Sequence, residues 1–258
     1  MKTFRLIRSP ASSAAYNMAL DEKILERYLE DGIGVFRVYR WEAPSFTYGF
    51  SQNPQDEIDL DKCASDGIQI AKRITGGGVL FHNDEITYSF VCSKEDVGEP
   101  ESVFVAYRDI CKFILRFYES FGLTPGFALQ AENFKERCAV HQLCSASHEK
   151  YDIVIGGKKI GGNAQKRRRQ VIFQHGSIPL SADLNFVRRY LHSLPDDISK
   201  SVTTLSEELR AVPQKDILEQ KLINAFADTF NVKFLNCEYP VILSLPQADE
   251  ESKYVILR

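Results

Sequence analysis

Cys144 is the first residue whose type and setting suggest chemistry. It lies in the polar run HQLCSASHEK, directly before the apolar alternation YDIV begins. A cysteine thiolate is a strong nucleophile and forms thioesters with acyl groups. Five other cysteines occur without any CxxC pair, at Cys63, Cys92, Cys111, Cys138 and Cys237. Because most free cysteines are buried and chemically inert, the type alone leaves two interpretations open, a spare loop thiol or a nucleophile.

Lys159 is the second candidate, in the segment GKKIGGNAQ. Its neighbours Gly161, Gly162 and Ala164 are small, and they leave a slot in which a ligand carbonyl could meet the lysine ammonium. The alternative is an ordinary solvated lysine in a hairpin.

Three consecutive glycines, Gly76 to Gly78, interrupt the segment KRITGGGVLFH. Without side chains, the backbone there can approach a ligand closely. The loop is not a phosphate-binding P-loop, because no Gly-Lys-Ser/Thr follows, and it is not a dinucleotide fingerprint, because no helix follows. A simple bulge or turn is the alternative.

Together these segments resemble one superfamily. The pattern R-x-T-G-G-G followed by a histidine, then K-I-x-G-x-A-Q and H-G-S-I, resembles the lipoate–protein ligases, octanoyltransferases and biotin–protein ligases. The resemblance runs from YNMALDE through RWEAPSFTYGFSQ to QHGSIPL, and only about the last fifty residues of the chain lack a recognisable motif. It implies the mixed-sheet catalytic domain of those enzymes.

Two chemistries occur in this superfamily. Ligases activate free lipoate with ATP, whereas transferases hold octanoate from acyl carrier protein as a cysteine thioester and then pass it to a lysine. Cys144 lies seven residues before Tyr151 and fifteen before Lys159. This spacing resembles the cysteine-dependent octanoyl-[acyl carrier protein]:protein octanoyltransferase group, as does Phe50, where ligases tend to have arginine.

Two features depart from that group. Gly78 makes the loop Gly-Gly-Gly, as in ligases, where transferases usually have Gly-Gly-Arg, and SASHEK shares little with the usual transferase loop except its length. An ATP-dependent lipoate–protein ligase and an amidotransferase between lipoyl-domain proteins therefore stay open as alternatives. ATP and magnesium would be needed only by the ligase, and the transferase implies no cofactor.

The resemblance also implies roles for individual residues. Cys144 is expected to be the thioester nucleophile, and Lys159 to lower its pKa and to contact the oxyanion or acyl carbonyl. One wall of the acyl slot is expected to comprise Arg73, Thr75, Gly76, Gly77, Gly78 and His82, and the other Gly162, Ala164 and His175. His148 follows Cys144 by four residues and would be adjacent only in a helical loop, so no Cys–His pair is expected.

The composition excludes several other classes. The 258 residues are 44% hydrophobic and 26% charged with a net charge of −3, which is ordinary for a soluble protein and unlike a nucleic-acid binder. No apolar run approaches the roughly 18 residues that a membrane helix needs, and the first residues lack an apolar signal core. We expect a cytoplasmic protein without a metal site, because its histidines and cysteines show no ligand spacing.

Hydrophobic periodicity predicts helices over 13–30, 102–121, 183–193 and 213–230. Strands are expected over 34–40, 68–73, 85–92 and 232–236, and the glycine pair 156–157 predicts a hairpin, with a second hairpin arm over 169–178. Hairpin-linked strands with helices grouped elsewhere favour an α/β (α+β) fold, a mixed, largely antiparallel sheet backed by helices. We expect residues 1–258 to form one catalytic domain without the accessory domain of ligases, with about 240–258 as an unassigned tail.

The basic run QKRRRQ at 165–170 is expected to be a solvated hairpin tip, or a surface that docks acidic proteins. It contains no aromatic residue that could stack on nucleic acid bases. The resemblance implies acyl carrier protein as the octanoyl donor. It also implies a lipoyl-domain acceptor, such as the glycine cleavage H protein or a dehydrogenase E2.

Overall fold

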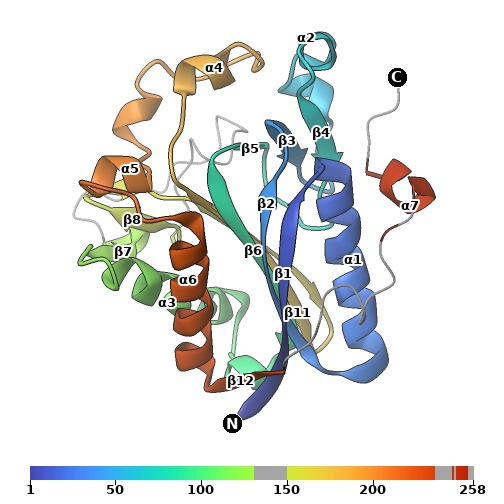
Figure 1. The fold of residues 1–258 in the computed structure, drawn as a ribbon, viewed down its shortest axis with the longest axis vertical. Helices are drawn as coiled ribbons and strands as arrows, with labels where there is room; N and C mark the ends of the chain where they lie inside the picture. The colour runs from blue at the N-terminus through green and yellow to red at the C-terminus, as the bar shows by residue number, and fades with distance from the viewer. Residues whose placement is uncertain (131–149, 236–245, 247, 255–258) are drawn as a thin grey trace.

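A computed structural model of the chain describes residues 1–130, 150–235, 246 and 248–254. Its centre is a six-stranded sheet in the order β10-β11-β6-β2-β1-β12 (Figure 1). The strands are β1 (Lys2–Ser12), β2 (Gly34–Trp41), β6 (Glu85–Ser93), β10 (Gly162–Arg168), β11 (Val171–Pro179) and β12 (Val232–Leu235). Neighbours from β10 to β2 are antiparallel, and β1 is parallel to both β2 and β12. The predicted mixed, largely antiparallel sheet is confirmed.

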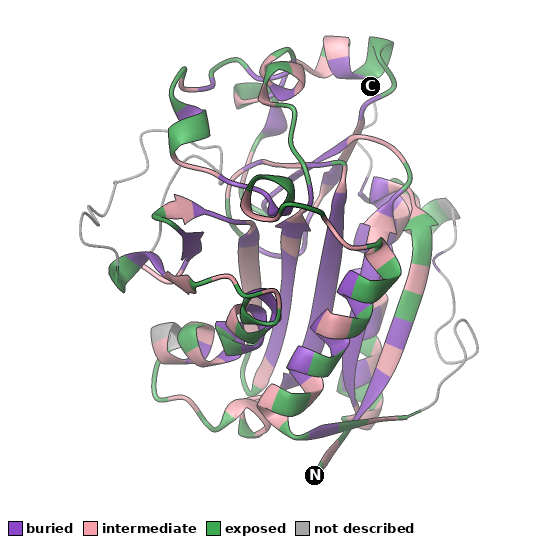
Figure 2. Cartoon of the chain, turned by 60° about the vertical axis from the view of Figure 1, so that its left-hand side comes forward, coloured by how far each residue is buried: buried purple, intermediate pink, exposed green. Residues whose placement is uncertain are grey.

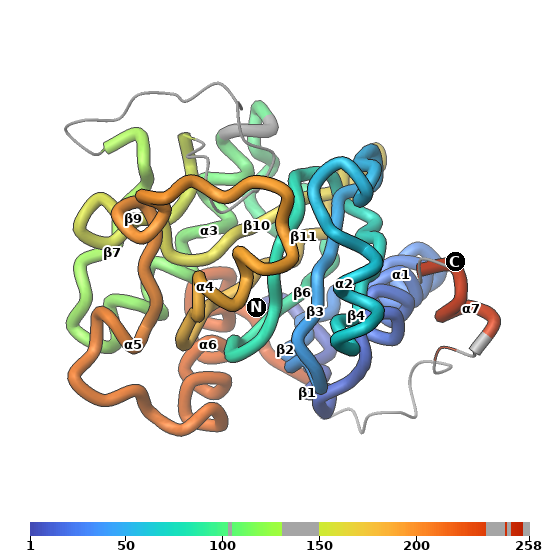
Figure 3. The backbone as a smooth tube through the Cα atoms, turned by 90° about the horizontal axis from the view of Figure 1, so that it is seen from above, coloured from blue at the N-terminus to red at the C-terminus, as the bar shows by residue number. Residues whose placement is uncertain are grey.

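Helix α1 (Ala14–Asp31) covers one face of this sheet. The Ser13 hydroxyl accepts a hydrogen bond from the Tyr16 amide and caps its first turn, and Gly32 ends it in the left-handed conformation, φ 68°. Alternation along β2 turns Val35 and Tyr39 toward α1. Figure 3 shows α1 on one side of the sheet and two further helices, α3 (Val103–Glu119) and α6 (Lys215–Phe230), on the other.

Helices α3 (Val103–Glu119) and α6 (Lys215–Phe230) cover the opposite face. Phe36 of β2 stacks on Phe226 of α6 with ring centroids 4.1 Å apart, and Phe113 of α3 meets both rings edge-on. Burial of such aromatic clusters is a main stabilising contribution in a core. Figure 2 shows that the central strands, which α1 covers on one face and α3 and α6 on the other, are almost entirely buried.

Two small sheets complete the part of the fold that positions the site. The first has the order β4-β3-β5 and the second β7-β8-β9. Their strands are β3 (Ser45–Tyr48), β4 (Gln69–Lys72), β5 (Leu80–His82), β7 (Pro125–Phe127), β8 (Ile153–Ile155) and β9 (Lys158–Lys159). The predicted strands at 68–73 and 34–40 and the hairpin around the glycine pair, now β8–β9, are confirmed, with Gly156 and Gly157 both at positive φ.

Short helices fill the connections: η1 (Pro54–Asp56), α2 (Leu60–Ser65), η2 (Glu95–Val97), η3 (Ala128–Gln130), α4 (Leu184–Arg188), η4 (Ile198–Lys200), α5 (Leu205–Glu208) and α7 (Ala248–Ser252). Among the described segments, no helix combines the length and the apolar character needed to cross a membrane.

Two predicted elements differ from the structure. The helix expected over 183–193 stops at Arg188, because the following backbone bonds elsewhere: the Asp59 amide donates to the Tyr190 carbonyl, and the His192 amide donates to the Glu57 carbonyl. The basic run is only partly a hairpin tip: Arg169 and Gln170 form the exposed turn between β10 and β11, as predicted, whereas residues 165–168 belong to strand β10. The turn itself lies at Arg169, which adopts a positive φ of 53°.

Candidate active site

Arg73 organises the glycine loop between β4 and β5. Its side chain is 2% exposed. The guanidinium Nη1 donates to the carbonyl and hydroxyl of Thr47, both at 2.8 Å. Nη2 donates to the carbonyls of Gly76, at 3.2 Å, and Gly78, at 2.7 Å. The loop is therefore wrapped around a buried cation rather than being a free turn.

The segment after β3 packs closely against the same loop. A Cβ atom on Gly49 would lie 2.1 Å from the Gly77 carbonyl oxygen, so only glycine fits at this close approach. Gly77 itself has a φ of 96°, which side chains rarely allow. The Phe50 amide donates to the Thr75 carbonyl at 2.8 Å. The loop conformation thus depends on glycines on both sides of the contact.

His82 is held in a buried polar network at the end of β5. Its ring stacks on Trp41 with centroids 4.0 Å apart, its Nε2 lies 2.6 Å from the Thr47 hydroxyl, and its Nδ1 lies 3.0 Å from Glu85 Oε1. Burial by itself would raise the pKa of Glu85. The charge of His82 and hydrogen bonds, including one from Ser177 at 2.8 Å, outweigh it, and the pKa lies below its usual value. Glu85 is therefore a carboxylate that fixes the imidazole.

His175 on β11 belongs to a second buried network, which links the glycine loop to α1. Its Nε2 lies 2.7 Å from the Thr75 hydroxyl, and its Nδ1 lies 3.2 Å from Asp21 Oδ2. Asp21 also accepts hydrogen bonds from Arg37, at 2.8 Å, and Ser89, at 2.7 Å. Burial opposes ionisation of Asp21, but the His175 bond and the Arg37 charge prevail and lower its pKa. The ionised carboxylate accordingly accepts a hydrogen bond from the Nδ1–H group of His175, and Nε2 accepts one from the Thr75 hydroxyl.

The buried imidazole predicts a pH dependence of stability. Burial lowers the His175 pKa and the hydrogen bond to Asp21 only partly opposes this, so the unfolded chain binds a proton below about pH 6.5 that the folded chain does not. The free energy of unfolding should therefore fall as the pH drops from 6.5 to 5, by at most about 1.4 kcal/mol per pH unit from this group. Urea unfolding of the wild type and His175→Gln across this range measures the difference in slope, which should be flatter in the variant.

The matched control is His192→Gln, because His192 is exposed. Its slope should follow that of the wild type. An unchanged slope in His175→Gln would contradict the assignment of a depressed pKa to His175.

The predicted walls meet in one cavity. A space of about 20 Å³ is lined by Trp41, Leu80 and Ser177 together with five of the residues expected from the sequence, Arg73, His82, Gly162, Ala164 and His175. Thr75 joins this group through His175, whereas Gly76, Gly77 and Gly78 do not line the space. A volume of this size holds about one water molecule, so an acyl chain needs more room than the slot has in this conformation.

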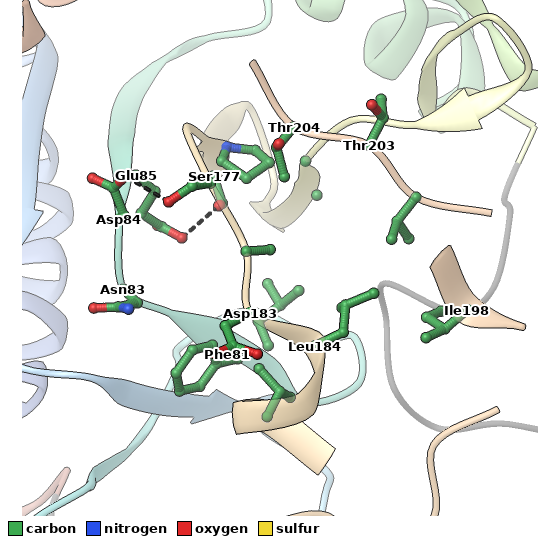
Figure 4. A pocket seen from close by; sticks show the side chains of 18 of the residues that line it. Phe81, Asn83, Asp84, Glu85, Ser177, Asp183, Leu184, Ile198, Thr203 and Thr204 are labelled. Atoms are coloured by element: carbon green, nitrogen blue, oxygen red, sulfur yellow. Dashed lines mark hydrogen bonds between the residues drawn. The ribbon is translucent and has the colours of Figure 1, made fainter. Parts of the chain in front are cut away.

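A larger cavity of about 200 Å³ adjoins the slot. The two share Leu80, Gly162 and Ser177 in their linings, and the larger one also contains Lys159. Figure 4 shows Phe81, Leu184 and Ile198 on its apolar side and Ser177 bonded to Glu85 on its polar side. An apolar cavity with a few polar groups at one end is typical of a small-ligand site.

Lys159 is fixed in place by its strand and by an ion pair. Its Nζ lies 2.8 Å from Asp152 Oδ2, and both side chains are buried. Strand β9 pairs Lys159 with Val154, and on its other side the Lys159 amide donates to Ser201 and the Thr203 amide donates back to the Lys159 carbonyl. The ammonium is thus held at the larger cavity by backbone bonds on both edges and by a carboxylate.

Asp152 was not among the candidates, although the hairpin register could have identified it. A two-residue turn at 156–157 pairs Ile155 with Lys158 and Val154 with Lys159. The period of two along a strand then sets residue 152 diagonally across from Lys159 on one face, within reach of a long side chain. No sequence pattern of this kind identifies Asp21 as the partner of His175, because Asp21 lies in α1 and His175 in β11, 154 residues later.

The cysteines divide into two groups. Cys63, Cys92 and Cys111 are at most 1% exposed, and burial raises the pKa of the Cys92 and Cys111 thiols well above the usual value. Such thiols are not available as nucleophiles. Cys144 lies outside the described residues, as do Cys138 and Cys237. Within the described ranges, no group of three or more potential ligands is placed to hold a metal ion.

Comparison with known proteins adds a family signal. A family model for the lipoyl protein ligase A/B catalytic domain matches residues 13–230. The octanoyltransferase LipM of Oceanobacillus iheyensis is 34% identical over 255 residues, covering 95% of this chain and 90% of that protein. LipM of Kyrpidia tusciae is 32% identical over 245 residues, covering 90% and 89%. A solved structure of a bi-partite lipoate protein ligase and its E2 lipoyl domain from Thermoplasma acidophilum aligns with a TM-score of 0.72 at 22% identity, covering 98% and 90% of the two chains, and supports the fold.

Proposed function

Because the chain belongs to the lipoyl protein ligase A/B catalytic-domain family, we propose that it is an octanoyltransferase acting in lipoate biosynthesis. It would take an octanoyl group from octanoyl–acyl carrier protein, hold it as a thioester on Cys144, and pass it to a lysine of a lipoyl-domain protein. The glycine cleavage H protein and dehydrogenase E2 are the proposed acceptors. The relatives named octanoyltransferase support the reaction type.

The observation that carries the proposal is the setting of Lys159. A buried ammonium, aligned by Asp152, lies at the edge of a cavity that is mainly apolar. Acyl transfer develops negative charge on the carbonyl oxygen, and a fixed donor in a dry site stabilises that charge strongly. Since Asp152 balances the lysine charge, we assign Lys159 first to the oxyanion and second to lowering the pKa of Cys144.

In the first half-reaction the Cys144 thiolate attacks the carbonyl carbon of the donor thioester. A new carbon–sulfur bond forms, the bond to the carrier sulfur breaks, and the departing thiolate takes up a proton. One thioester replaces another, so no ATP is consumed. Leu80, Gly162 and Ser177 lie where the slot and the larger cavity meet, and movement of Leu80 would give the octanoyl chain its room.

In the second half-reaction the neutral ε-amine of the acceptor lysine attacks the Cys144 thioester. An amide bond forms, the carbon–sulfur bond breaks, and the amine proton ends on the cysteine sulfur or in solvent. Lys159 would stabilise the oxyanion again. The buried hydrogen bonds that link Thr75, His175 and Asp21 would keep the glycine loop fixed relative to β11 during both steps.

Intact-protein mass spectrometry tests the proposal. The wild type, mixed with octanoyl–acyl carrier protein in the absence of ATP, should gain one octanoyl group that hydroxylamine removes. Addition of an apo lipoyl domain should discharge it. A protein that forms no such adduct, yet modifies the lipoyl domain when given ATP, magnesium and free lipoate, would instead be a ligase. Acylation only from an octanoylated lipoyl-domain protein would make it an amidotransferase.

A further inference from the structure

Phe50 is an exposed aromatic side chain beside the glycine loop. It is 61% exposed, although its backbone is bonded to Thr75. The ammonium groups of Lys72 and Lys166 lie 4.4 Å and 6.0 Å from its ring centroid. At an exposed site each such cation–π contact contributes only about 0.5–1 kcal/mol. The two contacts fix the orientation of the ring, but they do not explain why an apolar side chain is exposed to solvent here. An oriented, exposed aromatic among cations is typical of an interface anchor.

The cations continue along strand β10. Cross-strand partners share a face, and the pairs Ala164–His175, Lys166–Phe173 and Arg168–Val171 follow one another on the face of the acyl slot. We call Phe50, Lys72, Lys166, Arg168 and Arg169 the Phe50 patch. Within the described residues none of its four cations forms an ion pair, whereas Arg40 and Lys215, for example, are paired with carboxylates. The patch therefore offers uncompensated positive charge on a protein whose net charge is −3.

The patch lies to one side of the reacting groups. Gly162 lines both cavities, and Lys166 follows it by four residues on β10, which at 3.3 Å per residue is about 13 Å away. Arg168 is about 20 Å from Gly162 by the same measure. A partner bound here would need a long connection to reach Lys159.

We propose that the Phe50 patch docks the acidic carrier protein that delivers the acyl group, which rests on the proposed function. A carrier presents its acyl chain on a long, flexible prosthetic arm, so its body can bind well away from the nucleophile. The acceptor presents an amine on a lysine side chain, which is much shorter, so it must lie directly over the thioester. Opposite charges raise the association rate and select the partner, and salt weakens the effect.

A double charge reversal, Lys166→Glu with Arg168→Glu, tests this surface. The rate of acyl-enzyme formation is measured with octanoyl–acyl carrier protein and, separately, with octanoyl-pantetheine, a thioester without the protein. We expect kcat/KM for the carrier to fall at least about tenfold at low salt and the rate with octanoyl-pantetheine to stay unchanged. Phe50→Ser should show the same selectivity with a smaller loss. Lys233→Glu, an exposed cation on the opposite edge strand β12, is the matched control and should react like the wild type.

The outcomes separate the two proposals. A wild type that gains no octanoyl group even from octanoyl-pantetheine contradicts the proposed function before any variant is compared. If the wild type is acylated but the double variant reacts normally with both donors, or loses both equally, the docking proposal is wrong. It is also wrong if the double variant forms the acyl-enzyme normally and fails only in passing the group to a lipoyl domain, because the patch would then bind the acceptor.

Discussion

Cys144→Ser is expected to gain no octanoyl group from octanoyl–acyl carrier protein, and its transfer to a lipoyl domain should fall by at least about 10³-fold. A serine hydroxyl is a much weaker nucleophile than a thiolate near neutral pH, and without an added base it does not take over the exchange. Intact mass after mixing with the donor measures the adduct, and amide formation on the acceptor measures transfer. Cys63, Cys92 and Cys111 cannot replace Cys144 as the nucleophile, because their side chains are buried.

Cys138→Ser is the matched control, since Cys138 precedes Cys144 by six residues in the same segment. It should acquire one octanoyl group at the wild-type rate. An octanoyl adduct that persists in Cys144→Ser and disappears in Cys138→Ser would move the nucleophile to Cys138. Undiminished lipoylation by Cys144→Ser in the presence of ATP and lipoate would support the ligase instead.

Lys159→Met is expected to slow acyl-enzyme formation by about 10²–10³-fold, the typical effect of removing one oxyanion donor. It should also destabilise the fold by about 3–5 kcal/mol, because the buried Asp152 carboxylate would lose the ammonium charge that Lys159 places 2.8 Å away. Methionine keeps the unbranched apolar stem of lysine and removes the ammonium. Single-turnover acylation measures the first effect, and urea unfolding measures the second.

A second substitution separates these two effects. Asp152→Asn combined with Lys159→Met removes both charges and should recover most of the lost stability, while acyl-enzyme formation stays slow. A double variant that acylates at the wild-type rate would mean that Lys159 acts only as a structural partner of Asp152. The single variant Asp152→Asn should retain more activity than Lys159→Met, since the ammonium remains.

The sequence predicts the elements whose periodicity is long and uninterrupted. Residues 13–30, 102–121 and 213–230 become α1, α3 and α6 with ends within two residues of the prediction. The hairpin at Gly156-Gly157 follows from the turn chemistry alone. By contrast, β1 was not predicted, because Arg5 and Arg8 break its apolar alternation. The helix expected over 183–193 ends early because its later backbone groups bond to residues 57 and 59, a tertiary contact that no local pattern reveals.

The site divides in the same way. Motif resemblance brings Arg73, His82, Gly162, Ala164 and His175 into one list, and the structure brings them into one cavity. The resemblance does not indicate that the Arg73 guanidinium donates hydrogen bonds to the carbonyls of the glycine loop. Nor does it indicate that His82 and His175 each form a hydrogen bond with a buried carboxylate. Glu85 follows His82 by three residues, across the short connection from β5 to β6, whereas Asp21 lies 154 residues before His175 and only the three-dimensional arrangement connects that pair. The segment with Cys144 lies outside the described residues, so its role stays a prediction.

The position of β1 has a consequence during synthesis. It pairs on one side with β2, which follows soon after it, and on the other side with β12, which begins at Val232. At about 5–20 residues per second, the outer edge of β1 waits on the order of ten to fifty seconds on the ribosome before its partner exists. An unpaired strand edge invites association with other nascent chains, and charges and proline on the strand oppose it. Arg5, Arg8 and Pro10 lie on β1. The two arginines, which break the apolar alternation of the strand, would together with Pro10 also oppose association of its unpaired edge while the chain is incomplete.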